Sequence, residues 1–192
     1  MKEIILIGGG GHCKSVIDVI EQESKFRIIG IVDKLKCLGS SLLGYPYIGT
    51  DNDLNKLAKK YKYALITVGQ IKSASVRIKL FELAVRSGFL LPTIISPTSY
   101  ISKYSSIGNG VVVMHHAIVN AGASIGDNCI INSKALIEHD CKIFSHCHIS
   151  TNATINGGVT LEKGCFIGSN ATIKELARIR ENSLVKFGSL VP

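Results

Sequence analysis

Residues 125–154 decide the fold: written in sixes, they read IGDNCI, INSKAL, IEHDCK, IFSHCH and ISTNAT. The same pattern runs through fifteen hexads, from Ile101 to Leu190. Every hexad opens with Ile, Val or Leu, and its fifth residue is always Ala, Ser, Cys or Val. A strict period of six is typical of a parallel β-helix, in which each hexad supplies a short strand and a turn. With three hexads to a triangular coil, this segment would form five coils.

The first half of the chain follows a different pattern, in which strand-like and helix-like segments alternate. We expect strands at residues 3–8, 27–33 and 63–69, and helices at 14–24, near 51–61 and at 73–88. Alternating strands and helices predict a parallel sheet in a small Rossmann-like domain. We therefore expect two domains, residues 1–94 and 95–192. A ligand of the first would lie at the carboxyl ends of its strands.

The composition favours a globular, cytoplasmic protein. No apolar stretch approaches the roughly 20 residues of a membrane span, and the start MKEIILIGGGG does not resemble a signal peptide. Six cysteines without a secretory signal favour reduced thiols. The net charge is +8, but residues 1–100 hold 14 Lys and Arg against 8 Asp and Glu, without a dense basic run. A nucleic-acid surface is therefore not expected, whereas a small phosphorylated ligand is compatible with this charge.

Residues 137–150, IEHDCKIFSHCHIS, contain three histidines and two cysteines and could suggest a metal site. The cysteines, like Cys129 and Cys165, occupy the fifth hexad position, where a thiol serves as a small buried residue. The histidines fall at the third, fourth and sixth positions, whereas zinc needs about four convergent ligands. We therefore expect no metal. The remaining candidate is His139 beside Asp140, because an imidazole next to a carboxylate is the usual general base.

The two halves together carry a family resemblance. The opening LIGGGGH at residues 6–12, followed by hexapeptide repeats that contain IEHDC, resembles the bacterial nucleotide-sugar acetyltransferases with a left-handed β-helix. These include the bacillosamine N-acetyltransferases and the sialic acid O-acetyltransferases. The resemblance covers nearly the whole chain and implies a homotrimer that uses acetyl-CoA to N-acetylate a nucleotide-linked amino sugar. O-acetylation of a sialic-acid-like sugar, or a non-catalytic sugar-nucleotide-binding β-helix protein, are the alternatives.

The resemblance also implies roles for residues of the repeats. His139 would be the general base, and Asp140 would raise its basicity, at a position where the family more often has Glu. His148 and Asn132 match residues near the acetyl group of acetyl-CoA. Gly157 matches a glycine whose backbone N–H faces the thioester carbonyl.

The glycine-rich loop after the first strand is the candidate site for the sugar nucleotide. A dinucleotide fingerprint starting at Gly8 is broken at Cys13, which disfavours an NAD-dependent dehydrogenase. Exposed N–H groups at a helix N-terminus still bind phosphate, although the glycines could simply permit a tight turn. By the resemblance, the substrate contacts are six residues: Gly10, Gly11, His12, Asp33, Lys34 and Gly69.

Overall fold

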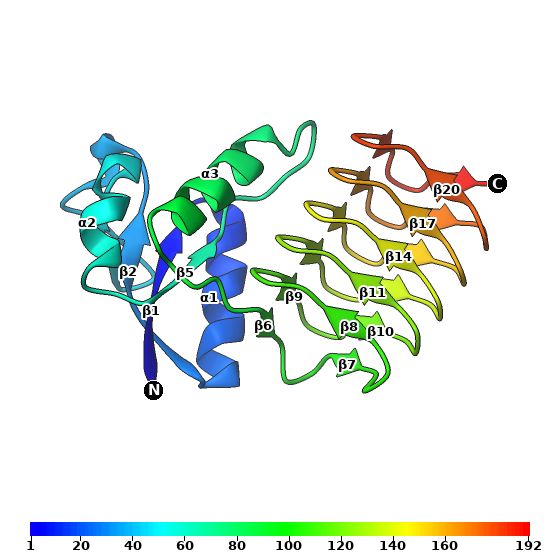
Figure 1. Ribbon diagram of the computed structural model, residues 1–192, viewed down its shortest axis with the longest axis horizontal. Helices are drawn as coiled ribbons and strands as arrows, with labels where there is room; N and C mark the ends of the chain where they lie inside the picture. Colours follow the sequence, from blue (N-terminus) through cyan, green and yellow to red (C-terminus); the bar gives the residue numbers. More distant parts are fainter. The chain divides into compact units, whose positions relative to one another are not determined.

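The computed structural model describes residues 1–192, except for the side chain of Lys36. It divides into two compact units, which Figure 1 draws with the chain coloured from blue to red. The first unit comprises Met1–Gly69 and Ser75–Pro92, and the second comprises Gln70–Ala74 and Thr93–Pro192. None of the described helices is long and apolar enough to cross a membrane.

The first unit is an α/β domain built on a sheet of order β3-β4-β2-β1-β5. Strand β1 pairs in parallel with β2 and with β5, and only the short β3 runs antiparallel to its neighbour β4. The elements are β1 Lys2–Ile7, α1 Gly11–Glu23, β2 Phe26–Val32, the 3₁₀ turn η1 Leu35–Cys37, β3 Ser41–Leu42, β4 Tyr45–Gly49, the 3₁₀ turn η2 Asp51–Asp53, α2 Leu54–Ala58, β5 Tyr63–Ile66 and α3 Ser75–Arg86. The predicted alternation of strands and helices is confirmed.

The carboxyl ends of β1, β2 and β5 lie level with one another. Ile7 of β1 pairs with Val32 of β2 and with Ile66 of β5. The loops that follow these strands therefore leave the same edge of the sheet, as they do in sheets that bind ligands at that edge. Helix α1 starts directly after the first of these loops and packs its apolar residues, including Val16 and Ile20, into the core.

The second unit is the predicted left-handed β-helix, whose coils Figure 1 shows stacked one above another. Each pairing joins residues eighteen positions apart, as Ile118 joins Leu136, so one coil holds three hexads. The strands are β6 Ile94–Ile95, β7 Tyr100–Ile101, β8 Ser106–Ile107, β9 Val112–Val113, β10 Ile118–Val119, β11 Ser124–Ile125, β12 Ile130–Ile131, β13 Leu136–Ile137, β14 Lys142–Ile143, β15 His148–Ile149, β16 Thr154–Ile155, β17 Thr160–Leu161, β18 Phe166–Ile167, β19 Thr172–Ile173, β20 Arg178–Ile179, β21 Leu184–Val185 and β22 Leu190–Val191. They form three sheets, and β6 adds one strand before the first hexad counted in the sequence.

The interior of the β-helix is filled by the first and fifth residues of the hexads. Fully buried isoleucines such as Ile137 and Ile149 alternate with small residues such as Ala135 and Ala153. Each buried aliphatic side chain contributes about 1.5–3 kcal/mol to the stability of the folded state. The period of six is strict because each of the three sides of every coil must place an aliphatic side chain in the interior.

The buried cysteines add a hydrogen bond to this packing. The Sγ atom of each contacts the backbone carbonyl fifteen residues ahead: Cys129 to Phe144 (3.3 Å), Cys141 to Asn156 (3.1 Å), Cys147 to Glu162 (3.1 Å) and Cys165 to Arg180 (3.0 Å). A thiol at this position is therefore both a small core residue and a donor to a turn carbonyl. Burial raises the pKa of Cys141, so this thiol stays protonated at neutral pH.

The turns place the fourth hexad residue in the left-handed region of backbone space. Asp140 has φ 60° and His146 has φ 64°. This conformation favours Gly, Asn, Asp and His, which occupy most of these positions. The same rule accounts for His116 (φ 57°) and His146 as turn residues.

Candidate active site

His139 and Asp140 form a hydrogen-bonded pair at the turn between β13 and β14. The Nδ1 atom of His139 lies 2.9 Å from Oδ2 of Asp140. Because a carboxylate accepts, the proton of the neutral ring resides on Nδ1, and Nε2 carries the lone pair. The side chains are 66% and 72% exposed. The predicted pair thus presents a basic nitrogen to the surroundings.

Two glycines make room for this pair, one on each adjacent coil. A Cβ on Gly157 would lie 2.7 Å from Cε1 and Nε2 of His139, so the imidazole rests against the Gly157 backbone. On the other side, a Cβ on Gly122 would collide with Oδ1 of Asp140. The structure therefore brings together His139, Asp140 and Gly157. Among the described residues, the N–H of Gly157 donates no hydrogen bond and is available to a ligand.

Two further residues, Gly122 and Glu138, support the pair and were not singled out from the sequence. Gly122 lies eighteen positions before Asp140, and this one-coil spacing is the signal that could have found it. Glu138 accepts a hydrogen bond from Nδ2 of Asn120 (2.9 Å) and a weak one from the His139 N–H (3.4 Å). It thereby fixes the backbone just before the imidazole.

His148 and Asn132 lie together, but on another part of the coil. Nδ2 of Asn132 is 3.2 Å from Nε2 of His148, and Nδ1 of His148 is 2.6 Å from the carbonyl oxygen of Gln70. His148 belongs to β15, nine residues and therefore half a coil after His139. The sheet that contains β15 faces the His139 corner across the triangular coil. One chain therefore does not bring His139 and His148 to the same place.

The glycine-rich loop leads into the N-terminus of α1. Gly10 is the N-cap residue, in extended conformation (φ −81°), and α1 has no capping side chain and no acidic residue in its first turn. A Cβ on Gly10 or Gly11 would meet nothing within 4 Å. His12 lies beside Gly69, whose added Cβ would be 3.6 Å from that of His12. These four predicted residues therefore share one edge of the sheet, with an uncapped helix N-terminus that suits a phosphate.

Asp33, which follows β2 directly, fixes this loop through hydrogen bonds. Its carboxylate accepts hydrogen bonds from the N–H of Gly9 and, at 2.6 Å, from the N–H of Lys34. Tyr47, which the sequence analysis did not single out, lies so close to Gly9 that a Cβ there would collide with its hydroxyl. Asp33 and Tyr47 therefore fix the conformation of the loop that Gly10 and Gly11 continue.

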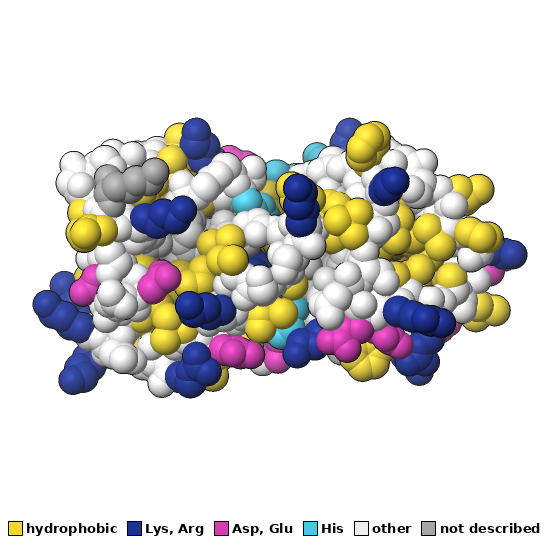
Figure 2. Space-filling model, turned by 90° about the horizontal axis from the view of Figure 1, so that it is seen from above, with side chains coloured by type: hydrophobic (Ala, Val, Ile, Leu, Met, Phe, Trp, Pro, Cys, Tyr) yellow, Lys and Arg dark blue, Asp and Glu magenta, His cyan; other side chains and the backbone are white. Residues whose placement is uncertain are grey.

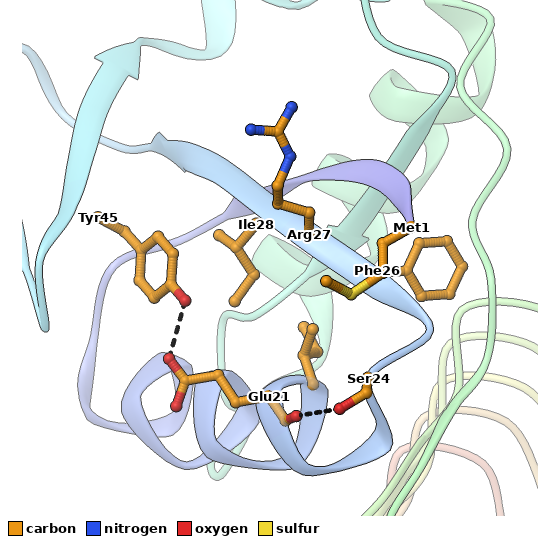
Figure 3. Close-up of a pocket in the computed structure, with 8 residues that line it drawn as sticks. Met1, Glu21, Ser24, Phe26, Arg27, Ile28 and Tyr45 are labelled. Carbon is orange, nitrogen blue, oxygen red and sulfur yellow. Dashed lines mark hydrogen bonds between the residues drawn. The ribbon is translucent and has the colours of Figure 1, made fainter.

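A separate shallow pocket of about 220 Å³ lies at the amino end of β2, in the first unit. In Figure 3 the Tyr45 side chain points to Glu21, and its hydroxyl donates to Oε1 of Glu21 at 2.8 Å. The lining residues are Met1, Ile20, Glu21, Ser24, Phe26, Arg27, Ile28 and Tyr45. None of the predicted site residues is among them.

The charged side chains on one face of the molecule are mixed in sign. On the face drawn in Figure 2, Lys and Arg side chains are scattered among Asp, Glu and hydrophobic side chains. Among the described residues, no cluster of His, Cys, Asp or Glu could hold a metal ion.

Family comparisons match both halves of the chain. Residues 3–83 match the PglD N-terminal domain, and residues 104–139 and 140–175 match the bacterial transferase hexapeptide (six repeats). A comparison with curated protein sequences found no match.

Solved structures match over the whole length. A histidine variant of perosamine N-acetyltransferase from Caulobacter crescentus, in complex with CoA and GDP-perosamine, is 30% identical with a TM-score of 0.93, over 100% of this chain and 89% of that chain. The acetyltransferase domain of PglB from Neisseria gonorrhoeae, in complex with acetyl coenzyme A, is 28% identical with a TM-score of 0.90, over 100% and 93%. PerB from Caulobacter crescentus, with CoA and GDP-perosamine, is 25% identical with a TM-score of 0.68, over 99% and 93%.

The α/β domain and the coils thus occur together in solved N-acetyltransferases. The chain belongs to the hexapeptide-repeat N-acetyltransferases that join a PglD-type domain to a left-handed β-helix, the family of the perosamine and bacillosamine enzymes.

Proposed function

We propose that this protein transfers the acetyl group of acetyl-CoA to an amino group of a nucleotide-linked amino sugar, such as a UDP-4-amino-4,6-dideoxy sugar. The product would serve surface glycan or glycoprotein biosynthesis. The observation that carries the proposal is the His139 ring, whose Nδ1 lies 2.9 Å from Oδ2 of Asp140 and whose Nε2 lies against the backbone of Gly157. The complexes of similar proteins with CoA and GDP-perosamine support both substrate classes.

The acetyl group passes directly from CoA to the sugar amine, and this chemistry needs no metal. The sugar amine attacks the thioester carbonyl carbon, and His139 Nε2 takes the amine proton as the C–N bond forms. The Gly157 N–H is proposed to stabilise the developing oxyanion. The C–S bond then breaks, and the imidazolium returns its proton to the CoA thiolate. Asp140 holds the ring in the tautomer that can accept, through the hydrogen bond to Nδ1.

Acetyl-CoA is proposed to bind between subunits of a homotrimer. His148 and Asn132 lie half a coil away from His139, so a site that uses all three residues needs two chains. The outer face of one sheet of the β-helix suits self-association because the outward residues of its strands are uncharged: they are Tyr100, Ile118, Leu136, Thr154, Thr172 and Leu190. A cyclic arrangement with heterologous contacts would repeat the site three times.

The sugar nucleotide is proposed to bind at the loop edge of the first unit. The N–H groups of Gly10 and Gly11 at the uncapped α1 would hold the diphosphate. His12, Lys34 and Gly69 are the further contacts, with Asp33 as the brace of the loop. We place the enzyme in the cytoplasm in this proposal, since its six cysteines are free thiols.

A direct assay tests this function. The protein is incubated with acetyl-CoA and a panel of UDP-, GDP-, dTDP- and CMP-linked amino sugars, and the released CoA thiol is measured. Acetylation of at least one amino sugar, and not of its hydroxyl analogue, is expected. Transfer only to a sialic-acid-like hydroxyl would establish the O-acetyltransferase alternative instead, and binding of a sugar nucleotide without transfer would indicate a non-catalytic protein.

A further inference from the structure

The segment Gln70–Ala74 belongs to the β-helix, although it lies between β5 and α3 in the chain. Gln70 anchors it. Nε2 of Gln70 donates to the backbone carbonyls of His146 (3.0 Å), Gly164 (3.3 Å) and Cys165 (3.4 Å). Gln70 is 3% exposed. Three carbonyls around one nitrogen fix the orientation of the amide, because its oxygen could not take that place.

The backbone carbonyl of Gln70 determines which ring nitrogen of His148 carries the proton. It lies 2.6 Å from Nδ1 of His148 and can only accept, so Nδ1 carries the hydrogen. The imidazole is 6% exposed and meets Phe166 edge-on, with ring centroids 5.1 Å apart. The ring is therefore fixed in both orientation and tautomer.

The assignment continues to Asn132. The N–H of Ser133 donates to Oδ1 of Asn132 at 2.8 Å, which directs the Asn132 amide nitrogen towards Nε2 of His148, 3.2 Å away. With Nδ1 protonated, Nε2 accepts from this nitrogen. One amide hydrogen is then committed to His148, and the second is the one that a ligand could engage.

We propose that Gln70 is a positioning residue for acetyl transfer: it sets the tautomer of His148 and thereby aims the Asn132 amide at acetyl-CoA. The inference rests on the proposed function for the role of Asn132. The Gln70–His148–Asn132 chain of hydrogen bonds stands independently of it. A Gln at this position retains a buried Oε1 without a hydrogen-bond partner among the described residues. Such an atom destabilises the fold, so the three donated contacts of the amide must outweigh it.

The tautomer is tested by NMR of the ligand-free protein with ¹⁵N-labelled histidine, in which the His148→Gln variant identifies the His148 signals. In the wild type we expect a pyrrole-type Nδ1 and a pyridine-type Nε2. If the wild-type spectrum showed the proton on Nε2 and not on Nδ1, the proposal would be overturned before any Gln70 variant was measured. In Gln70→Met we expect a mixture of tautomers, and an unchanged His148 spectrum would also overturn it.

Kinetics test the consequence for the reaction. Gln70→Met removes the donated contacts together with the unsatisfied oxygen that they outweigh, so we expect a modest fall in melting temperature with the fold intact. The KM for acetyl-CoA should rise about three- to tenfold, the equivalent of one hydrogen bond, with the KM for the sugar nucleotide unchanged. Lys72→Ala, an exposed residue of the same segment, is the control. A tautomer change with unaltered acetyl-CoA kinetics would refute the positioning role. Absence of acetyl transfer by the wild type would instead refute the proposed function.

Discussion

The imidazole of His139 rests on the backbone of Gly157, one coil away, with space for no more than a hydrogen between them. A Cβ at Gly157 would come within 2.7 Å of Cε1 and Nε2 of the ring. The proposed general base and the proposed oxyanion donor are therefore held by one contact. This relationship depends on the eighteen-residue coil, which places the third residue of every third hexad in one column.

Gly157→Ala should lower turnover by about 10²-fold, the cost of a displacement near 1 Å at a reacting group. Gly157 does not have a positive φ, so an alanine backbone is tolerated there and only the imidazole must move. Steady-state kinetics with acetyl-CoA and the best sugar nucleotide measure the effect. Glu175→Ala, in the same column one coil further on and exposed, should keep the wild-type rate. Equal rates for Gly157→Ala and wild type would mean that the His139 position is not critical.

Asp140→Asn should reduce kcat less than removal of the imidazole does. An asparagine oxygen can still accept from Nδ1 of His139, so the tautomer is kept while the charge is lost. Asn also tolerates the left-handed conformation of Asp140 (φ 60°). Asp140→Ala should be more harmful, since it loses both the acceptor and the favourable backbone preference. If the Asn and Ala variants were equally active, Asp140 would have no role in orienting the ring.

Gly10→Leu should raise the KM for the sugar nucleotide on the order of tenfold or more, since each tenfold change costs 1.4 kcal/mol of binding. Gly10 has an ordinary φ and free space around its Cα, so the substitution disturbs the ligand and not the domain. Titration calorimetry should give an unchanged affinity for acetyl-CoA. Lys14→Leu, on the exposed side of α1, controls for added hydrophobic surface. Equal loss of both ligands would show that the loop is not specific to the sugar nucleotide.

Mixed trimers test the shared site. His139→Ala and His148→Ala chains are each expected to be impaired alone, because each removes one half of every site. Refolded together in equal amounts, they should recover about a quarter of the sites, those that combine two intact halves. Light scattering at micromolar concentration should give a homotrimer. No recovery in mixed trimers, or a fully active monomer, would place the whole site within one chain.

The native thiols should be unreactive, apart from one. Burial raises the pKa of Cys13 to about 11. The pKa values of Cys147 and Cys165 are raised as well. The largest cause is the hydrogen bond of each to the thiol eighteen residues before it, and burial adds to this effect. Only Cys37 is neither buried nor stacked in the coils. A thiol reagent at pH 8 should therefore titrate one group in the folded protein and all six in denaturant, and Cys37→Ser should remove the fast reaction.

The same pKa shifts predict the pH dependence of stability. A pKa raised in the folded state stabilises that state only while the thiol is protonated, so this stability is complete below the pKa of an unfolded thiol and is lost as the pH rises towards the folded value. The melting temperature should fall between pH 8 and pH 11, and Cys13→Ala should reduce this fall. An identical pH profile in wild type and Cys13→Ala would contradict the assignment.

The sequence predicted the β-helix because the eighteen-residue coil leaves its period in every hexad. The same period identifies the neighbours of a turn residue, so that the column of His139 and Gly157 can be read from spacing alone. Gln70 could not be found in this way, since it lies outside the repeats and its contact with His148 spans 78 positions. The turn between β3 and β4 was also missed, because Leu43 and Gly44 adopt positive φ without the Asn-Gly sequence that usually marks such turns.

The rate of CoA release by His139→Ala, measured with saturating acetyl-CoA and the amino sugar that the wild type acetylates, tests the mechanism most directly. His139 is largely exposed, so the variant should keep the wild-type circular dichroism and oligomeric state. We expect turnover to fall by about two to four orders of magnitude, the range for loss of a positioned general base. A His139→Ala protein that acetylates the same sugar at the wild-type rate would contradict the assignment of His139 as the base.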